Sequence, residues 1–248
     1  MSTHPELRAK WKKADYPDGM GSAAVVAPPT DGSLRVYHMM SAEYAISAIG
    51  LCRLKVARFS DLNDPFELLS LSFKEKPARK WARGFKDSFD SHTGLVCFSR
   101  NWTNPVLWSH YASKHKGICL GFDLIRSLAE DVTYVDKRLL ATVDDPPAAI
   151  DKDLQKKLLC TKFQHWHYEQ EVRCFIPLKH ATKEGNLHFF PLIDPLLRLS
   201  EVILGPECQL SLAAVRRLTS ALHPGAVTFG SRLAFKFFNV VPFEPSVP

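Results

Sequence analysis

The hydrophobic pattern of the chain switches repeatedly between the period of a strand and that of a helix. Apolar residues alternate with polar ones, or run together, in segments that predict strands at residues 34–40, 53–60, 94–99, 118–123, 132–136, 165–178, 201–205 and 233–241. Apolar residues recur every three or four positions in segments that predict helices at residues 42–50, 70–90, 105–116, 211–225 and in the second part of 144–163. This interleaving, without a repeat period, predicts one mixed α+β domain.

The first 32 residues differ from the rest in composition. They are polar, carry proline and glycine at intervals and end in the turn-forming sequence APPTDGS. We therefore predict a flexible leader over residues 1–32 and a single α+β domain over residues 33–248. The leader lacks the apolar stretch of a secretory signal, and no apolar run approaches the roughly 18 residues of a membrane span. These features predict a cytoplasmic protein with no membrane partner.

Basic residues outnumber acidic ones by 32 to 26, so a polyanionic partner such as nucleic acid is compatible with the chain. Part of this charge lies at residues 76–86, where Trp81, Phe85 and Phe89 mark every fourth position of a predicted helix. One face of that helix would be aromatic and the other basic. We predict an amphipathic helix packed on the core, with contact to nucleic acid or a membrane surface as the alternative.

The six cysteines are spread through the chain with no C-x-x-C pair, and most lie inside apolar segments. Reduced thiols of a core show this distribution, whereas zinc sites and disulfide frameworks use closely spaced cysteines. We therefore expect no structural metal.

The segment HWHYEQEVR carries the densest set of ionisable residues. In an extended chain alternate side chains share a face, so His165, His167, Glu169, Glu171 and Arg173 would lie together. Such groups are costly to bury, and we expect them to face a cleft or water. Glu169 and Glu171 would be about 6.6 Å apart, a spacing suited to a general base beside a charge stabiliser, with Arg173 keeping one carboxylate ionised. The alternative is a solvated strand face with ordinary ion pairs.

The helix predicted at residues 105–116 places Trp108, Tyr111, Ala112 and His115 on one face. An aromatic stripe at this spacing usually belongs to a core. Alternatively, it forms a planar wall on which a heteroaromatic ring stacks, and Tyr111 is then the first candidate because its hydroxyl needs a partner when buried.

Two shorter segments have similar double interpretations. His38 lies in the first predicted strand, just before a helix N-terminus. Ligands with anionic groups or hydroxyls bind at such a place, although a lone histidine on a strand is more often structural. In the turn DLNDPFE, Asp61, Asn63 and Asp64 either close the turn and cap a helix or hold a loop over a ligand.

Several segments together resemble a bacterial family of domains of unknown function. They are YHMMSAEYAISAI, RLKVARFSDLNDPFE, VCFSRNWTNPVLWSHYASKHKGICLGFD, WHYEQEVR and EVILGP, which run from Tyr37 to Pro206. The family is marked by the NDPFE turn, the W-x-x-Y-A helix followed by HKG, and the W-x-Y-E-x-E-x-R strand. It is in turn distantly similar to the ADP-ribosyltransferase fold, in particular to the toxin-like branch that modifies nucleic acid.

The resemblance implies split, twisted β-sheets flanked by helices, and NAD as a substrate. It gives His38 the adenosine-side ribose, and Glu171 or Glu169 the nicotinamide ribose, with Arg173 beside them. Asn63, Asp64, Trp108 and Tyr111 would complete the NAD site. The stacking aromatic residue of such enzymes usually comes from the second strand, where this chain offers only Phe59 and Ser60. Either Tyr111 takes that role, or the chain does not hold nicotinamide in the usual way.

The function expected from the resemblance is NAD-dependent ADP-ribosyl transfer, by a toxin or phage-defence effector acting on nucleic acid or protein. Replacing Glu171 by Gln would then remove most activity and leave the fold intact. A non-catalytic sensor that binds a nucleotide or a partner is the alternative, and a metal-dependent nuclease is a third hypothesis. The chain lacks the glycine pattern of a Rossmann fold, which excludes an ordinary dehydrogenase.

Overall fold

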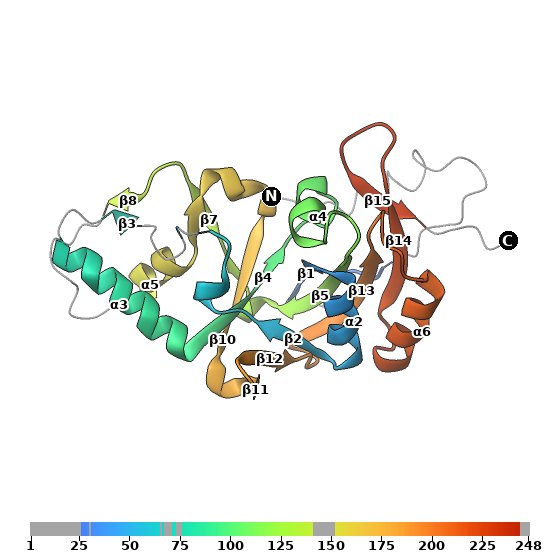
Figure 1. Cartoon of the computed structure of the whole chain (residues 1–248), viewed down its shortest axis with the longest axis horizontal. Helices are drawn as coiled ribbons and strands as arrows, with labels where there is room; N and C mark the ends of the chain where they lie inside the picture. Colours follow the sequence, from blue (N-terminus) through green and yellow to red (C-terminus); the bar gives the residue numbers. More distant parts are fainter. Residues whose placement is uncertain are drawn as a thin grey trace.

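The computed structural model describes residues 26–29, 31–64, 66, 71–72, 76–140 and 152–243, and an eight-stranded β-sheet runs through the centre of this part of the chain (Figure 1). Most of the predicted leader therefore lies outside the described residues. The part that is described contacts the domain, because Val26 packs against a core cluster and the Ala27 carbonyl accepts a hydrogen bond from Arg35.

Helices and strands interleave along the sequence, so the predicted mixed α+β domain is confirmed. The helices are α2 (Ala42–Gly50), α3 (Lys76–His92), α4 (Pro105–Tyr111), α5 (Lys152–Leu159) and α6 (Leu212–Leu222). The strands are β1 (Ser33–Met40), β2 (Arg53–Val56), β3 (Leu71–Ser72), β4 (Thr93–Ser99), β5 (Ile118–Ile125), β6 (Glu130–Asp131), β7 (Thr133–Val135), β8 (Leu139–Leu140), β9 (Thr161–Phe163), β10 (Glu171–Pro177), β11 (Thr182–Glu184), β12 (Leu187–Pro191), β13 (Leu197–Leu204), β14 (Val227–Leu233) and β15 (Val240–Phe243).

The large sheet has the order β15-β14-β13-β5-β1-β4-β10-β6. Its neighbours are antiparallel except for the parallel pair β13 and β14. β1 is paired with β5 along its whole length but meets β4 at Tyr37 and Ser99. The sheet therefore curls away on either side of this junction, and a three-stranded sheet, β11-β12-β2, lies beside it (Figure 1).

The two faces of the sheet carry different cores. On one face Val36 joins a large apolar cluster with Ile49 of α2 and Val215 of α6. On the other face the next residue, Tyr37, belongs to a second cluster with Trp108 of α4. Because successive side chains of a strand point to opposite faces, neighbouring residues of β1 serve different cores.

Helix α3 has the predicted amphipathic form. Trp81 stacks on Phe85, and Phe85 contacts Phe89, which reaches the core ring of Phe59. The basic residues Lys76, Arg79, Lys80 and Arg83 of the helix are exposed, and the helix itself lies at the left edge of Figure 1. None of the six cysteines, which all lie in the described part of the chain, forms a disulfide. No helix in the described part of the chain combines the length and apolarity needed to cross a membrane.

Several predicted elements are wrong in extent. The strand expected at residues 53–60 ends at Val56, and residues 71–72 of the helix expected at residues 70–90 form the short strand β3. The helix expected at residues 105–116 ends at Tyr111, because the chain turns left-handed at Ser113, Lys114 and His115. The strand expected at residues 165–178 begins only with β10, after a 3₁₀ turn. The strand expected at residues 233–241 is a hairpin turn between β14 and β15. In these last three cases local turn hydrogen bonds replace the expected element: the amides of Gly117, Gln170 and Ala234 donate to the carbonyl oxygens of Ala112, His167 and Asn239, respectively.

The left-handed turn ends at Gly117, and this position admits no side chain. A Cβ atom there would lie 2.1 Å from the Met40 carbonyl oxygen, whereas a Cβ atom at Gly84 in α3 would meet nothing within 4 Å.

We expect Gly117→Ala to lower the free energy of unfolding by about 2 kcal/mol or more, since the backbone must move to admit the methyl group. Gly84→Ala, the matched control, should raise it by about 0.5–1 kcal/mol. Urea unfolding of both variants measures this, and equal stability of Gly117→Ala and the wild type would contradict it.

Candidate functional site

The segment that precedes β10 folds as a 3₁₀ turn, Gln164–Glu169, rather than as a strand. Gln170 then takes a left-handed conformation, with a φ of 45°, and its carbonyl accepts a hydrogen bond from the Arg100 amide at 3.0 Å. The single extended face predicted for this segment is therefore wrong. Glu169 and Glu171 nevertheless lie close together, and both carboxylates contact the same ammonium group.

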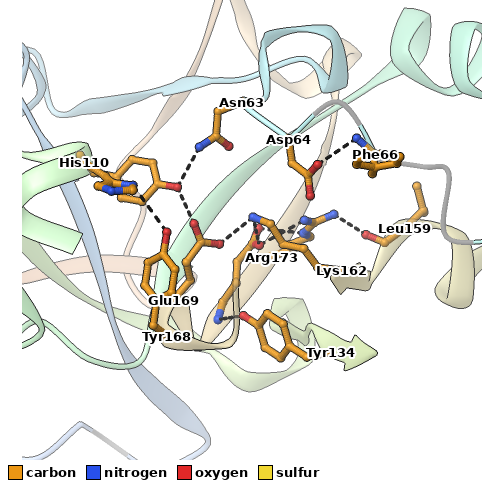
Figure 2. A network of polar contacts seen from close by, with 12 residues as sticks. Asn63, Asp64, Phe66, His110, Tyr134, Leu159, Lys162, Tyr168, Glu169 and Arg173 are labelled. Atoms are coloured by element: carbon orange, nitrogen blue, oxygen red, sulfur yellow. Dashed lines mark hydrogen bonds and ion pairs between the residues drawn. The ribbon is translucent and has the colours of Figure 1, made fainter. Parts of the chain in front are cut away.

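That ammonium group belongs to Lys162 in the short strand β9. Its Nζ atom lies 2.6 Å from Oε2 of Glu169 and 3.1 Å from Oε2 of Glu171 (Figure 2). The relative exposures are 7% for Lys162 and 5% for each glutamate, so the three charges are buried together. Lys162 was not predicted as a site residue. The available signal was a lone lysine between the apolar segment Leu158–Cys160 and Phe163.

Arg173, in β10, is the second cation beside the two carboxylates, and it is fully buried. Its Nε atom donates to Oε1 of Glu171 at 2.8 Å and its Nη2 atom to Oε2 at 3.1 Å, which makes a two-point contact. Nη1 donates to the Leu159 carbonyl oxygen at 2.6 Å, at the end of α5. Two carboxylates thus face two cations in the interior.

A route from this buried group to the surface runs through Tyr111. The Tyr111 hydroxyl donates to Oε1 of Glu169 and accepts from Nδ2 of Asn63 at 3.0 Å. Asn63 is exposed and Tyr111 is half-buried. Figure 2 shows this chain of contacts from the Asn63 loop to Glu169, Lys162 and Arg173. We call the six residues Asn63, Tyr111, Lys162, Glu169, Glu171 and Arg173 the Lys162 cluster.

Aromatic and imidazole rings surround the Lys162 cluster. Trp166 lies over the Lys162 ammonium, with 4.8 Å from Nζ to the ring centroid. The Tyr134 hydroxyl accepts a hydrogen bond from the Glu171 amide at 2.8 Å, and its ring contacts His167. Further rings line the same side: His110 and Tyr168 pack edge to face with centroids 6.1 Å apart. These rings are exposed or half-buried, so they form an aromatic rim around the charges.

The two glutamates have pKa values that move in opposite directions. Burial raises the pKa of Glu169, and this effect outweighs the lowering of the pKa by the Lys162 ammonium and the Tyr111 hydroxyl. Burial also disfavours ionised Glu171, but Arg173 and then Lys162 overcome it and lower its pKa to about 2. Burial, together with Glu169, raises the pKa of Tyr111, which therefore stays a donor.

The expectation that these ionisable groups face a cleft or water is thus wrong for Glu169, Glu171 and Arg173. They are buried because opposite charges and hydrogen bonds replace water around each of them. The expectation that Arg173 keeps one carboxylate ionised agrees with the lowered pKa of Glu171.

His38 does not lie with the carboxylates. Ser99 is the register partner of both Tyr37 and Glu171, so these three side chains share one face of the sheet. His38, one residue along β1, projects from the opposite face, where its ring contacts Phe98. Its Nδ1 atom lies 2.7 Å from the Cys97 carbonyl oxygen, and burial lowers its pKa.

The other predicted site residues divide between turn and core. The buried Asp64 accepts a hydrogen bond from the Phe66 amide at 2.9 Å, which closes the turn that carries Asn63. Trp108 is fully buried, and its Nε1 atom donates to the Trp102 carbonyl oxygen at 2.5 Å. The structure therefore links Asn63 and Tyr111 to Glu169 and places Trp108 in the core.

Across the described ranges, no group of three or more His, Cys, Asp or Glu residues is arranged to hold a metal ion. Comparison with known proteins finds no match for this chain among protein-family models, curated proteins or solved structures.

Removal of the central ammonium tests the charge balance. We expect Lys162→Met to lower the free energy of unfolding by about 3–5 kcal/mol, because both buried carboxylates would lose the cation that lies between them. The matched control is Lys156→Met. Lys156 pairs with Glu130 at the surface, so its loss should change stability by at most about 1 kcal/mol. Chemical denaturation near neutral pH measures both, and equal effects of the two variants would contradict the buried-pair interpretation.

Acid stability tests the ionised state of Glu171. Its pKa is lowered from 4.5 to about 2 on folding, so its contribution is present above pH 4.5 and is lost as the pH falls towards 2. We expect the unfolding free energy of the wild type to fall across this window. The curve of Glu171→Gln should be flatter there, and that of the exposed control Glu43→Gln should follow the wild type. Urea titrations at several pH values measure these slopes, and parallel curves for all three proteins would contradict an ionised Glu171.

Proposed function

We propose that the Lys162 cluster is the catalytic centre of an NAD-dependent ADP-ribosyltransferase-like protein. The contact between Tyr111 and Glu169 is the observation that most supports it. Through this contact, one hydrogen-bonded chain joins the NDPFE turn, the W-x-x-Y-A helix and the E-x-E-x-R segment, which are three of the segments that carry the family resemblance.

The charges of the cluster suit cleavage of the bond between nicotinamide and ribose. In that reaction the pyridinium nitrogen keeps the bonding electrons and leaves as neutral nicotinamide, while positive charge develops on the ribose. A carboxylate in a water-poor site stabilises such charge, as in glycoside cleavage. The opposite pKa directions of Glu169 and Glu171 also favour a division of roles, with one permanent anion and one group that exchanges a proton.

In this proposal Glu169 is the acting carboxylate and Glu171 is a positioning residue. Glu171 is bound on both oxygens by Arg173 and Lys162, whereas one oxygen of Glu169 is reached from the surface through Tyr111. A substrate hydroxyl that replaces the Asn63 amide would donate to the Tyr111 oxygen. Glu169, with its raised pKa, would take the proton of the acceptor.

With these roles, Glu169→Gln is a better test of activity than Glu171→Gln. Glu171→Gln would leave two buried cations facing one neutral amide, so it tests stability before activity. Glu169→Gln keeps an oxygen that accepts from Tyr111, and a raised pKa means that the neutral form is already less unfavourable there. We leave His38 outside the proposed site because its side chain lies on the other face of the sheet.

The acceptor is proposed to be nucleic acid or protein. Exposed Lys76, Lys80 and Arg83 follow one stripe of α3 and favour a polyanion. A second candidate function is a non-catalytic sensor that binds a nucleotide at the aromatic rim. The complete pairing of Glu171 favours it, since a fully satisfied buried network is also what a purely structural role requires.

The proposal predicts release of nicotinamide from NAD by the full chain, assayed with and without nucleic-acid and protein acceptors. Glu169→Gln and Tyr111→Phe should each lower turnover by about a hundredfold, because each removes a group at the reacting centre. NAD should still raise the melting temperature of both variants, since each substitution removes at most one of the contacts to the substrate. Glu43→Gln, an exposed substitution in α2, is the matched control and should keep full turnover.

Other outcomes separate the two functions. Thermal stabilisation by NAD without nicotinamide release would favour the sensor. Neither stabilisation nor release would contradict both functions. Release that survives in Glu169→Gln and Tyr111→Phe would contradict the assignment of the site, whatever the reaction.

A further inference from the structure

The hairpin between β14 and β15 exposes phenylalanines at its tip. Residues 234–239 form the turn, closed by a hydrogen bond from the Ala234 amide to the Asn239 carbonyl oxygen at 2.9 Å. Phe235 is 83% exposed and Phe238 is 97% exposed. Exposed single apolar residues are common, but two nearly bare phenylalanines on one turn mark a contact surface.

The strands behind this tip are held firmly in the domain. Phe229 in β14 and Val240 in β15 are buried in the cluster that also contains Trp108. The Val240 amide donates to the Thr103 carbonyl oxygen at 2.8 Å, just before α4. The loop after β14 therefore projects from a fixed base, as the uppermost red ribbon in Figure 1 shows.

The charge of the hairpin has a single sign. Residues 227–243 contain no aspartate or glutamate, and they include Arg232 and Lys236. The Arg232 guanidinium lies over the Phe235 ring, 4.7 Å from its centroid, and Lys236 is exposed between the phenylalanines. Apolar rings and cations thus occupy the same turn.

We propose that this tip binds the surface of a membrane that contains anionic lipids, with Phe235 and Phe238 inserted at the headgroup level. Phenylalanine rings gain free energy by leaving water for the acyl boundary, and nearby cations are attracted to anionic headgroups. This contact is peripheral, so the proposal departs from the expectation of no membrane partner, and it is independent of the proposed NAD chemistry.

The shape of the tip favours a bilayer over the other occupants. Single-stranded nucleic acid stacks its bases on rings that line a groove, whereas these rings stand on a projecting turn. A second copy would bring the same cations to the same contact, which opposes pairing tip to tip. A bilayer surface is soft and can admit a projecting ring.

Co-sedimentation of the full chain with vesicles tests the proposal. Binding is expected to vesicles of phosphatidylcholine with phosphatidylglycerol, and much weaker binding to phosphatidylcholine alone. The double variant Phe235→Ala and Phe238→Ala should bind at least about tenfold more weakly, since each ring removed from water accounts for about that factor. Lys236→Glu should bind several-fold more weakly, and added salt should reduce this difference.

Tyr44→Ala is the matched control, because Tyr44 is a ring exposed elsewhere, on α2, and its loss should leave vesicle binding unchanged. Melting temperatures confirm that each variant is folded. No binding to anionic vesicles, or equal binding by the double variant, overturns the proposal. Binding of an oligonucleotide, or self-association in solution, that depends on Phe235 and Phe238 while vesicles do not bind also overturns it.

Discussion

The ammonium group of Lys162 lies between two buried carboxylates, and the arrangement around it depends on this position. Without a cation there, Glu169 and Glu171 would repel one another in a medium that screens charge poorly. With it, the 3₁₀ turn before β10 closes onto β9, and Arg173 can pair with both oxygens of Glu171. The cluster is therefore one electrostatic unit, in which removal of any member changes the ionisation of the others.

One member of this unit, Glu171, also lies where the two halves of the large sheet meet. Ser99 in β4 is in register with Tyr37 on one side and Glu171 on the other. The face that carries Glu171 is thus continuous with the face that carries Tyr37 and that α4 covers through Trp108. Because α4 ends at Tyr111, the helix that closes this core also presents the phenol that reaches Glu169.

Much of the fold could be predicted from the sequence, because strands and helices bury one side and the period of the apolar residues shows it. The helix capped by Ser41 and the buried strands β4 and β5 are examples. The cluster could be predicted only in part. Residue type and spacing point to Tyr111 and the two glutamates. The position of Lys162 among apolar residues hints at burial, but it does not show that the ammonium meets residues seven and nine positions later. His38 was misplaced for a related reason, since the faces of a strand are distinguished only when its neighbours in the sheet are known.

The left-handed backbone at Ser113, Lys114 and His115, after α4, restricts which residue types these positions can carry. Ser113 and Lys114 are exposed, so their side chains contribute little, while their backbones adopt angles that residues with a Cβ atom rarely occupy. The fold requires a particular backbone conformation at these positions, because it brings Gly117 close to the carbonyl group of Met40. Glycine and asparagine adopt that conformation more easily than serine or lysine. Homologous chains would therefore be expected to vary freely here in charge and size, yet to avoid β-branched residues.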